Sequence, residues 1–437
     1  MSDTSILLSK FSQKEAKICI VGLGYVGLPL LLRFFEEGFS VLGLDIDKLK
    51  IEKINAGETY IQSIPEHNIK KLSLSAKSEI TNDFSKINDC DAIVICVPTP
   101  LSKNFEPNLD YVKATMSSIM PYLKQGQIIS LESTTYPGTT EEEIREPLEN
   151  QGFDVGKNFF VVYSPEREDP GNQKYDTKSI PKICGGVTDN CLKIGSSMYR
   201  AVIDEVIEVS STKVAELSKL LENIYRSINI GLVNEMKVIA DKMGIDIYEV
   251  IDAAATKPFG FKAFYPGPGL GGHCIPIDPY YLTWKAKEFG INSKFIELSG
   301  EVNRSMPDYV VSKANDALNL KKKSINSSKI LVLGISYKKN VDDCRESPSV
   351  EVIRLLQKKG AELDYSDPYF SEFPKLRSFK CDLKSVALTE ENIKKYDLVI
   401  LCTDHDLYDY GLIKNNADLI VDTRGVFELD QDNILRA

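Results

Sequence analysis

The sequence predicts an α/β protein with two Rossmann-like, doubly wound parallel-sheet domains joined by a long-helix, mostly α-helical central segment. Apolar runs typical of buried strands alternate with helical patterns in the first part of the chain, and the same alternation returns near its end. Between these parts, helical periodicity continues without a strand candidate. We therefore expect three segments, 1–212, 213–320 and 321–437.

The first segment opens with a polar leader and then the run KICIVGLG at 17–24, a strand that ends in glycine. A helical pattern follows from Tyr25 to Glu37, where Gly38 stops it. Further apolar runs predict strands at 40–47, 91–98, 127–133 and 159–165.

A long helix is expected from Thr212 to about Gly244, and the basic, serine-containing stretch 320–329 is the expected linker. The last segment then repeats the α/β pattern. It predicts strands at 329–336, 361–367, 397–403 and 418–424, with a helix at 349–360.

Composition excludes several classes of function. The 437 residues hold 63 acidic and 53 basic side chains, a net charge of −10 that disfavours nucleic acid as a partner. Nine scattered cysteines without a CxxC pair indicate free thiols in a reducing compartment, and three dispersed histidines give no reason to expect a metal site. The longest apolar run, 18–32, is too short and too rich in glycine to span a membrane, and no cleavage site follows it. These features predict a cytoplasmic protein without membrane contact.

The glycines at 22, 24 and 27 form G-x-G-x-x-G between a predicted strand and a predicted helix. The first glycine permits the turn, the second admits a pyrophosphate, and the third allows close helix–strand packing. Asp45 ends the next strand, where a carboxylate accepts hydrogen bonds from ribose hydroxyls and repels a 2′-phosphate. This arrangement predicts NAD rather than NADP, while the glycine motif alone leaves FAD open.

Residues 265–282, YPGPGLGGHCIPIDPYYL, place Cys274 in a glycine-rich loop rather than in an apolar strand, with Asp278 four residues later. A thiol in such a loop is a candidate nucleophile. On the long helix, Lys219, Asn223 and Arg226 share one face, which is either a solvated stripe or a site in which lysine stabilises a developing alkoxide.

The sequence resembles the UDP-glucose/GDP-mannose dehydrogenase family of nucleotide-sugar dehydrogenases along nearly the whole chain. Seven motifs in order carry the resemblance: VGLGYVGLPL at 21–30, VPTPL at 97–101, ESTTYPGTT at 132–140, YSPEREDPGN at 163–172, AELSKLLENIYR at 215–226, GPGLGGHCIPIDPYYL at 267–282 and SYKKNVDDCRESPS at 336–349.

The resemblance implies an NAD-dependent four-electron oxidation of the C6 hydroxymethyl of a UDP-sugar, through a cysteine thiohemiacetal and thioester. It implies catalytic roles for Cys274, Lys219, Asn223, Asp278, Thr134 and Glu166. The cofactor contacts that it implies are Gly22, Gly24, Tyr25, Val26, Gly27, Asp45, Thr99, Thr134 and Arg345. The substrate contacts that it implies are Glu166, Arg167, Lys219, Asn223, Arg226, Gly271, His273 and Lys338.

Two departures indicate a branch of the family. Ile277 stands where the UDP-glucose branch has lysine, and Pro170 stands where that branch carries a second glutamate. The pattern is more similar to the UDP-N-acetylhexosamine branch, with UDP-N-acetylglucosamine as the expected substrate ahead of its mannosamine and galactosamine isomers and UDP-glucose. The product would then be a precursor of surface polysaccharide. Glu132 and Glu141–Glu143 are interpreted as helix-start and surface charges.

A strongly apolar helix that joins two domains needs a partner surface, so the helix at 213–244 predicts association into a homo-oligomer, with a dimer expected. We assign NAD binding, dimerisation and UDP-sugar binding to the three segments in order. Two rival functions remain open: a two-electron dehydrogenase of a small hydroxy acid, and an NAD-responsive binding protein with a vestigial site. Thiol alkylation would leave the first of these active, and the second would form no NADH.

Overall fold

The computed structural model describes residues 2–61, 64–102, 104–167, 177–272, 275–374, 376, 379, 381–429 and 431–437. The chain forms two compact units, of which the first contains residues 1–222 and 280–291 and the second contains residues 223–279 and 292–437. The division into segments at 212 and 320 stays a prediction.

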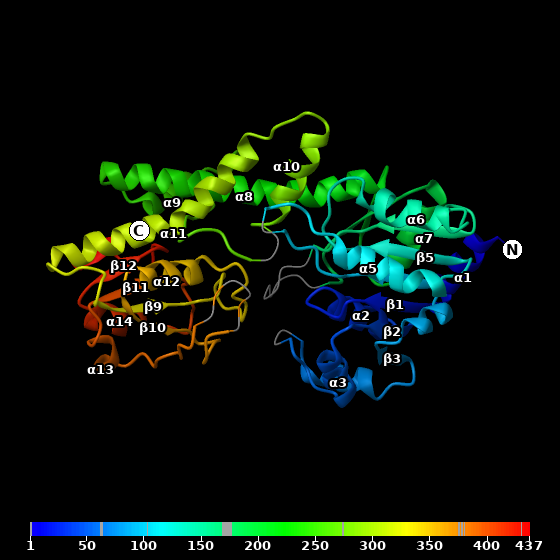
Figure 1. The fold of residues 1–437 in the computed structure, drawn as a ribbon, viewed down its shortest axis with the longest axis horizontal. Helices are drawn as coiled ribbons and strands as arrows, with labels where there is room; N and C mark the ends of the chain where they lie inside the picture. The colour runs from blue at the N-terminus through cyan, green and yellow to red at the C-terminus, as the bar shows by residue number, and fades with distance from the viewer. Residues whose placement is uncertain are drawn as a thin grey trace. The chain divides into compact units, whose positions relative to one another are not determined.

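In the described part of the first unit, eight strands form one sheet in the order β3-β2-β1-β4-β5-β6-β7-β8. Figure 1 labels β1, β2, β3 and β5 of this sheet. Neighbouring strands are parallel except β6 and β7, which run antiparallel. The order through β6 is that of a dinucleotide-binding fold. The strands are β1 (Lys17–Val21), β2 (Ser40–Leu44), β3 (Ser78–Thr81), β4 (Ala92–Ile95), β5 (Gln127–Leu131), β6 (Phe159–Tyr163), β7 (Lys182–Gly186) and β8 (Val206–Val209).

Helices connect these strands because each parallel pair needs a crossover. The central strands β4, β5 and β6 are buried along their whole length, as expected for a sheet covered on both faces. The α-helices described between residues 2 and 200 are α1 (Asp3–Gln13), α2 (Gly27–Glu36), α3 (Lys48–Ala56), α4 (Glu66–Ser73), α5 (Asp110–Ile119), α6 (Glu146–Asn150) and α7 (Asp189–Arg200), with a π-helical stretch at Glu141–Arg145.

The N-terminal residues correct one expectation. The stretch interpreted as a polar leader forms helix α1, in which the Ser2 side chain accepts a hydrogen bond from the backbone N–H of Ser5. Leu7 and Phe11, which are one helical turn apart, are buried in the core of the first unit. Such a narrow apolar face gives only a weak periodic signal among polar residues.

The expected long helix is present as α8 (Thr212–Met243), and it is followed by α9 (Ile247–Ala255), α10 (Asp278–Glu288) and α11 (Phe295–Leu320). The described residues between 213 and 320 form no strand, in agreement with the sequence pattern. In the described part of the chain, no helix is long and apolar enough to cross a membrane.

In the described part of the second unit, five parallel strands follow the order β10-β9-β11-β12-β13, which is the other common doubly wound arrangement. The elements are β9 (Lys329–Leu333), α12 (Pro348–Lys358), β10 (Glu362–Ser366), α13 (Glu390–Ile393), β11 (Leu398–Leu401), α14 (Tyr410–Asn416), β12 (Ile420–Asp422) and β13 (Ile434–Arg436). The predicted α/β class with two doubly wound sheets is therefore confirmed.

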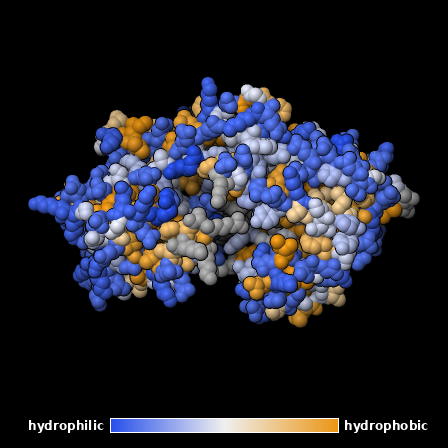
Figure 2. All heavy atoms as spheres, viewed as in Figure 1, coloured by the Kyte–Doolittle hydropathy of each residue, from blue (hydrophilic) through white to orange (hydrophobic). Residues whose placement is uncertain are grey.

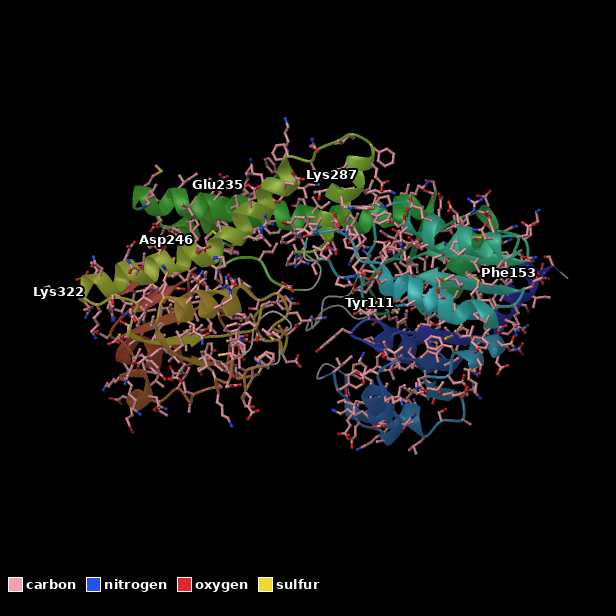
Figure 3. All side chains as sticks on the ribbon, viewed as in Figure 1. Tyr111, Phe153, Glu235, Asp246, Lys287 and Lys322 are labelled. Carbon is pink, nitrogen blue, oxygen red and sulfur yellow. The ribbon has the colours of Figure 1, made fainter. Side chains whose placement is uncertain are left out.

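An ion pair ties the end of this sheet to a central helix. The guanidinium of Arg436 lies 3.1 Å from Asp246, which is labelled in Figure 3 and caps the N-terminus of α9. The same guanidinium contacts the buried Asp422 carboxylate after β12. Elsewhere, the face in Figure 2 is mainly hydrophilic, with small groups of apolar side chains.

Candidate active site

The glycine motif follows β1 and has the geometry that a dinucleotide loop needs. Gly22 has a φ of +93°, and a Cβ there would lie 2.7 Å from the Cys96 carbonyl oxygen. A Cβ on Gly27 would lie 1.9 Å from the Gly22 oxygen, so only glycine permits this close approach of α2 to the strand. Gly24 has open space where its Cβ would be. The loop is therefore suited to a pyrophosphate at the N-terminus of α2.

Asp45 lies directly after β2, as the dinucleotide interpretation requires. Its carboxylate accepts the Leu23 N–H at 2.8 Å and the Asp47 N–H at 2.9 Å, and Lys50 Nζ lies 3.1 Å away. These contacts fix the carboxylate beside the glycine loop, where ribose hydroxyls are bound in this fold. Lys50 is a member of this site that the sequence interpretation did not include.

The loops after β4 and β5 meet through two threonines predicted to contact the cofactor. Thr99 Oγ1 donates to the Thr134 carbonyl at 2.7 Å. From the first turns of α10, the buried Tyr281 hydroxyl donates to the Thr99 carbonyl at 2.9 Å. These contacts hold the two threonine loops together at the carboxyl ends of the parallel strands, where ligands bind in such sheets.

Lys219 and Glu166 meet within the first unit. Lys219 Nζ donates to the Glu166 carbonyl at 2.5 Å and lies 3.5 Å from its carboxylate. The next residue, Arg167, donates to the Pro181 carbonyl at 2.6 Å and forms an ion pair with Glu222 at 2.8 Å. The segment 165–167 is therefore held by side chains and backbone from several elements.

Asn223 and Asp278 meet within the second unit. The Asn223 side-chain amide donates to the Asp278 carboxylate, and both side chains are almost fully buried. Arg226, which was expected on the same helix face, is exposed. The predicted face is thus buried at its first two positions and open to solvent at the third.

The glycine-rich loop before Cys274 packs against the loop after β9. A Cβ on Gly271 would lie 2.7 Å from the Tyr337 side chain, and the Gly272 N–H donates to the Arg345 carbonyl at 3.1 Å. The Arg345 guanidinium forms an ion pair with Asp343 at 2.7 Å, and Lys338 lies half-buried in this loop. Cys274 and His273 themselves lie outside the described residues.

Side chains from α8 hold the beginning of the same loop. The Gly267 N–H donates to Asn234 Oδ1 at 3.1 Å, and Lys237 Nζ donates to the Gly267 carbonyl at 3.4 Å. Burial, together with the positive charge of Arg424, lowers the pKa of the Lys237 amine to about 7. Neither Asn234 nor Lys237 was identified from the sequence, because nothing in the pattern of a long helix says which turn faces a distant loop.

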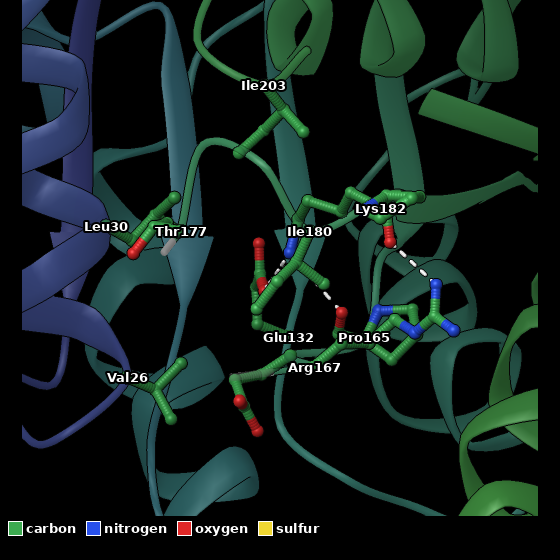
Figure 4. A pocket seen from close by; sticks show the side chains of 11 residues that line it. Val26, Leu30, Glu132, Pro165, Arg167, Thr177, Ile180, Lys182 and Ile203 are labelled. Carbon is green, nitrogen blue, oxygen red and sulfur yellow. Dashed lines mark hydrogen bonds and ion pairs between the residues drawn. The ribbon is translucent and has the colours of Figure 1, made fainter. Parts of the chain in front are cut away.

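A cavity in the first unit is lined on one side by residues near the cofactor loop and on another by the 165–167 segment (Figure 4). Val26, the residue before α2, and Leu30 of α2 line it. Across from them lies a buried ion pair, in which Lys182 Nζ is 2.6 Å from Glu132 Oε2. The lining also includes Pro165, Glu166, Arg167, Thr177, Ile180, Pro181 and Ile203. Tyr25, the neighbour of Val26, is partly buried against the core.

Glu132 corrects the sequence interpretation, which assigned it to a helix start or the surface. The residue is only 1% exposed. Besides Lys182, its carboxylate accepts a hydrogen bond from the Tyr199 hydroxyl at 2.6 Å. Burial raises the pKa of the Glu132 carboxyl, and Lys182 opposes that shift.

The fold and this arrangement define an NAD-dependent dehydrogenase, and comparisons with known proteins agree. The chain matches the NAD binding domain of the UDP-glucose/GDP-mannose dehydrogenase family over residues 16–203, its central domain over 213–305 and its UDP binding domain over 331–429. The chain belongs to the UDP-glucose/GDP-mannose dehydrogenase family. The predicted enzyme class and the predicted cofactor, NAD, are thereby confirmed.

Individual relatives share a third of the sequence. The chain is 36% identical to UDP-N-acetyl-D-glucosamine 6-dehydrogenase of Pseudomonas aeruginosa, over 82% of this chain and 84% of the relative. It is 33% identical to UDP-N-acetyl-D-mannosamine dehydrogenase of Methanococcus maripaludis, over 94% and 93%. The solved structure of a UDP-D-ManNAc dehydrogenase from Pyrococcus horikoshii superposes with a TM-score of 0.86 and 30% identity, covering 96% of this chain and 98% of that one.

Proposed function

We propose that this enzyme oxidises the C6 hydroxymethyl of a UDP-N-acetylhexosamine to the uronic acid, with UDP-N-acetylglucosamine as the preferred substrate. The observation that carries this proposal is the extended similarity to relatives named for N-acetylglucosamine and N-acetylmannosamine sugars. The relative named for the glucosamine sugar has the higher identity of these two, although it covers less of the chain. The mannosamine and galactosamine isomers and UDP-glucose are the alternatives, and the product would serve surface polysaccharide synthesis.

The cofactor, when bound, accepts a hydride in each of two oxidation steps. We assign Gly22, Gly24 and Gly27 to its pyrophosphate, Asp45 to its adenosine ribose, and Thr99 and Thr134 to its other half. The assignments of Tyr25, Val26 and Arg345 as further cofactor contacts rest on the family resemblance. The open Gly24 backbone and the fixed Asp45 carboxylate support this placement.

We assign the chemistry on the sugar to a thiol and a small set of polar groups. Lys219 stabilises negative charge on the C6 oxygen while the alcohol releases its proton to solvent and gives a hydride to NAD, which leaves an aldehyde. The Cys274 thiolate then adds to the aldehyde carbon, and the resulting thiohemiacetal can lose a second hydride to become a thioester. Asn223 orients the C6 oxygen, and Asp278 accepts a proton from the water that hydrolyses the thioester.

Hydrolysis releases the carboxylate and restores the thiol, so one sugar consumes two NAD and one water. The family resemblance suggests roles for Thr134 and Glu166 in this chemistry. Arg167, Arg226, Gly271, His273 and Lys338 are assigned to the substrate. The burial of Lys219 and Asn223 favours this function over a solvated stripe, because buried polar side chains need specific partners.

The test is NADH formation over a panel of UDP-sugars: N-acetylglucosamine, N-acetylmannosamine, N-acetylgalactosamine and glucose. About two NADH per sugar are expected, whereas one NADH per sugar would contradict the thioester route. Cys274→Ser should stop acid formation while NAD binding persists, and Cys381→Ser serves as the matched thiol control. If no UDP-sugar caused a rise in NADH absorbance, that result would instead favour the NAD-responsive binding protein with a vestigial site.

We further propose a cytoplasmic homodimer formed through α8. Exposed apolar side chains recur along this helix at intervals of three, four or seven residues, which places them on one stripe. A long apolar stripe in water favours association with a second copy. The stripe comprises Leu217, Leu221, Tyr225, Leu232, Met236, Ile239 and Met243. Light scattering of the wild type and of Leu232→Glu tests this, and a monomeric wild type would contradict it.

In this proposal, segment 1–212 binds NAD, and segment 213–320 carries the cysteine loop and the dimer contact. Segment 321–437 binds the UDP-sugar.

A further inference from the structure

The buried ion pair between Glu132 and Lys182 has no role in the proposed reaction. Glu132 directly follows β5 and Lys182 begins β7, and the two side chains are 1% and 10% exposed. Tyr199 donates to the other Glu132 oxygen at 2.6 Å, and Ser130 lies 2.7 Å from that hydroxyl. Every oxygen of the Glu132 carboxylate therefore has a partner, and the pair is a completed network.

A network of this kind needs an explanation other than stability. Removing two opposite charges from water costs free energy that their attraction often fails to recover, and well-packed apolar side chains frequently replace such pairs without loss. Glu132, at the end of β5, and Lys182, at the start of β7, are both buried at positions where apolar residues would satisfy the packing. They also line the cavity of Figure 4, on the side of the 165–167 segment.

The ion pair and the residue before it contact the 165–167 segment. Lys182 Nζ, besides contacting Glu132, lies 3.4 Å from the Pro165 carbonyl. Arg167 donates to the carbonyl of Pro181, the residue before Lys182. Between these two points, the Glu166 carbonyl accepts a hydrogen bond from Lys219. The backbone that presents Glu166 to Lys219 is thus supported on both sides by the start of β7.

We propose that Glu132 and Lys182 are positioning residues that fix the 165–167 backbone so that Glu166 meets Lys219. This inference rests on the proposed function, which gives Glu166 and Lys219 their roles. Glu132 holds the Lys182 ammonium in place, and Lys182 in turn holds the Pro165 carbonyl. Neither side chain needs to touch the reacting atoms.

The test separates charge balance from positioning. Lys182→Met and Glu132→Gln each leave one charge buried without its partner, so both should lower the melting temperature. The double variant contains neither charge and should regain a melting temperature close to that of the wild type. It still lacks the ammonium that supports Pro165. Lys10→Met is the matched control, because it breaks a 2.6 Å ion pair with Asp91 elsewhere in the first unit.

With the best sugar of the panel, kcat of the double variant should stay about ten- to a hundredfold below that of Lys10→Met, since small misplacements of reacting groups cost that much. The KM for NAD should stay within about twofold. Lys182→Arg should recover part of the lost kcat because it keeps the charge. A double variant with the kcat of the control would overturn the inference.

Hydrogen exchange at the Glu166 and Arg167 amides gives a readout that needs no substrate. Exchange there should be faster in the double variant than in Lys10→Met, and unchanged exchange would refute the positioning role. If the wild type oxidised none of the UDP-sugars, the proposed function would fail, while the exchange result would still decide whether the ion pair supports this segment.

Discussion

Replacing Lys237 with methionine is expected to stabilise the second unit at pH 7. Lys237 is 3% exposed, and burial is the main reason why its pKa falls from 10.5 to about 7. A difference of about 3.5 pH units, at about 1.4 kcal/mol per unit, corresponds to about 5 kcal/mol. Charged Lys237 thus destabilises the folded protein by about that amount relative to the unfolded chain.

Proton binding by Lys237 determines whether the free energy of unfolding rises or falls with pH. Between about pH 7 and 10.5 the unfolded chain holds the Lys237 proton and the folded protein has released it. The free energy of unfolding therefore rises with pH across this window. The destabilisation is fully present below pH 7 and disappears above about pH 10.5.

Methionine removes the charge and keeps the length of the side chain. The variant loses the 3.4 Å hydrogen bond to Gly267, worth about 1 kcal/mol. The net gain should be about 3–4 kcal/mol at pH 7 and should fall to about zero near pH 10.

Urea unfolding followed by circular dichroism at pH 7 and pH 10 measures this change. Lys242→Met, an exposed lysine on the same helix, is the control. If Lys237→Met were less stable than the control at pH 7, or if its gain did not shrink by pH 10, the amine would have compensating partners and the reasoning would be refuted.

Three further outcomes are expected. Gly27→Ala should abolish NAD binding measured by calorimetry, because the alanine methyl group would lie 1.9 Å from a backbone oxygen. Gly24→Ala has open space for its methyl group and should fold normally, so it tests only the approach of the pyrophosphate. Asp45→Ala should reduce the preference for NAD over NADP in kcat/KM by about tenfold or more, and an unchanged ratio would contradict its assignment to the ribose. Burial raises the pKa of Glu216 to about 7, so the free energy of unfolding should fall as pH rises from about 4.5 to 7. Glu216→Gln should show a flatter pH dependence. In urea titrations at pH 5 it should lose about 1–3 kcal/mol of stability, because Gly138 or Thr140 loses its hydrogen-bond acceptor.

Most of the strands that the sequence predicted are buried on both faces, although the half-exposed edge strand β10 was also predicted and the buried strand β7 was missed. β1, β4, β5 and β6 read as continuous apolar runs because helices cover the sheet on either side. β3 and β8 were missed, since each is four residues long and mostly polar or exposed at the sheet edge. β13 is only three residues long and was missed for the same reason.

The site residues also fall into those that the sequence could place and those that it could not. Motif residues such as Thr99 and Thr134 could be placed because each follows a recognisable strand. Glu132 could not be placed, because its partner Lys182 is 50 residues away and opens a strand that the sequence pattern did not reveal. Lys237 was missed for a related reason, since a buried lysine is indistinguishable from a solvated one in the pattern of a helix.

The antiparallel pairing of β6 and β7 has an evolutionary consequence. A parallel neighbour would need a crossover of fixed minimum length, but an antiparallel neighbour lets the chain leave and re-enter the sheet at the same end. Outside the fixed 165–167 segment, residues between these strands can thus be inserted or deleted without changing the register of the sheet. Differences in length among relatives should concentrate in the part of this connection beyond the 165–167 segment, where they carry the smallest penalty for folding.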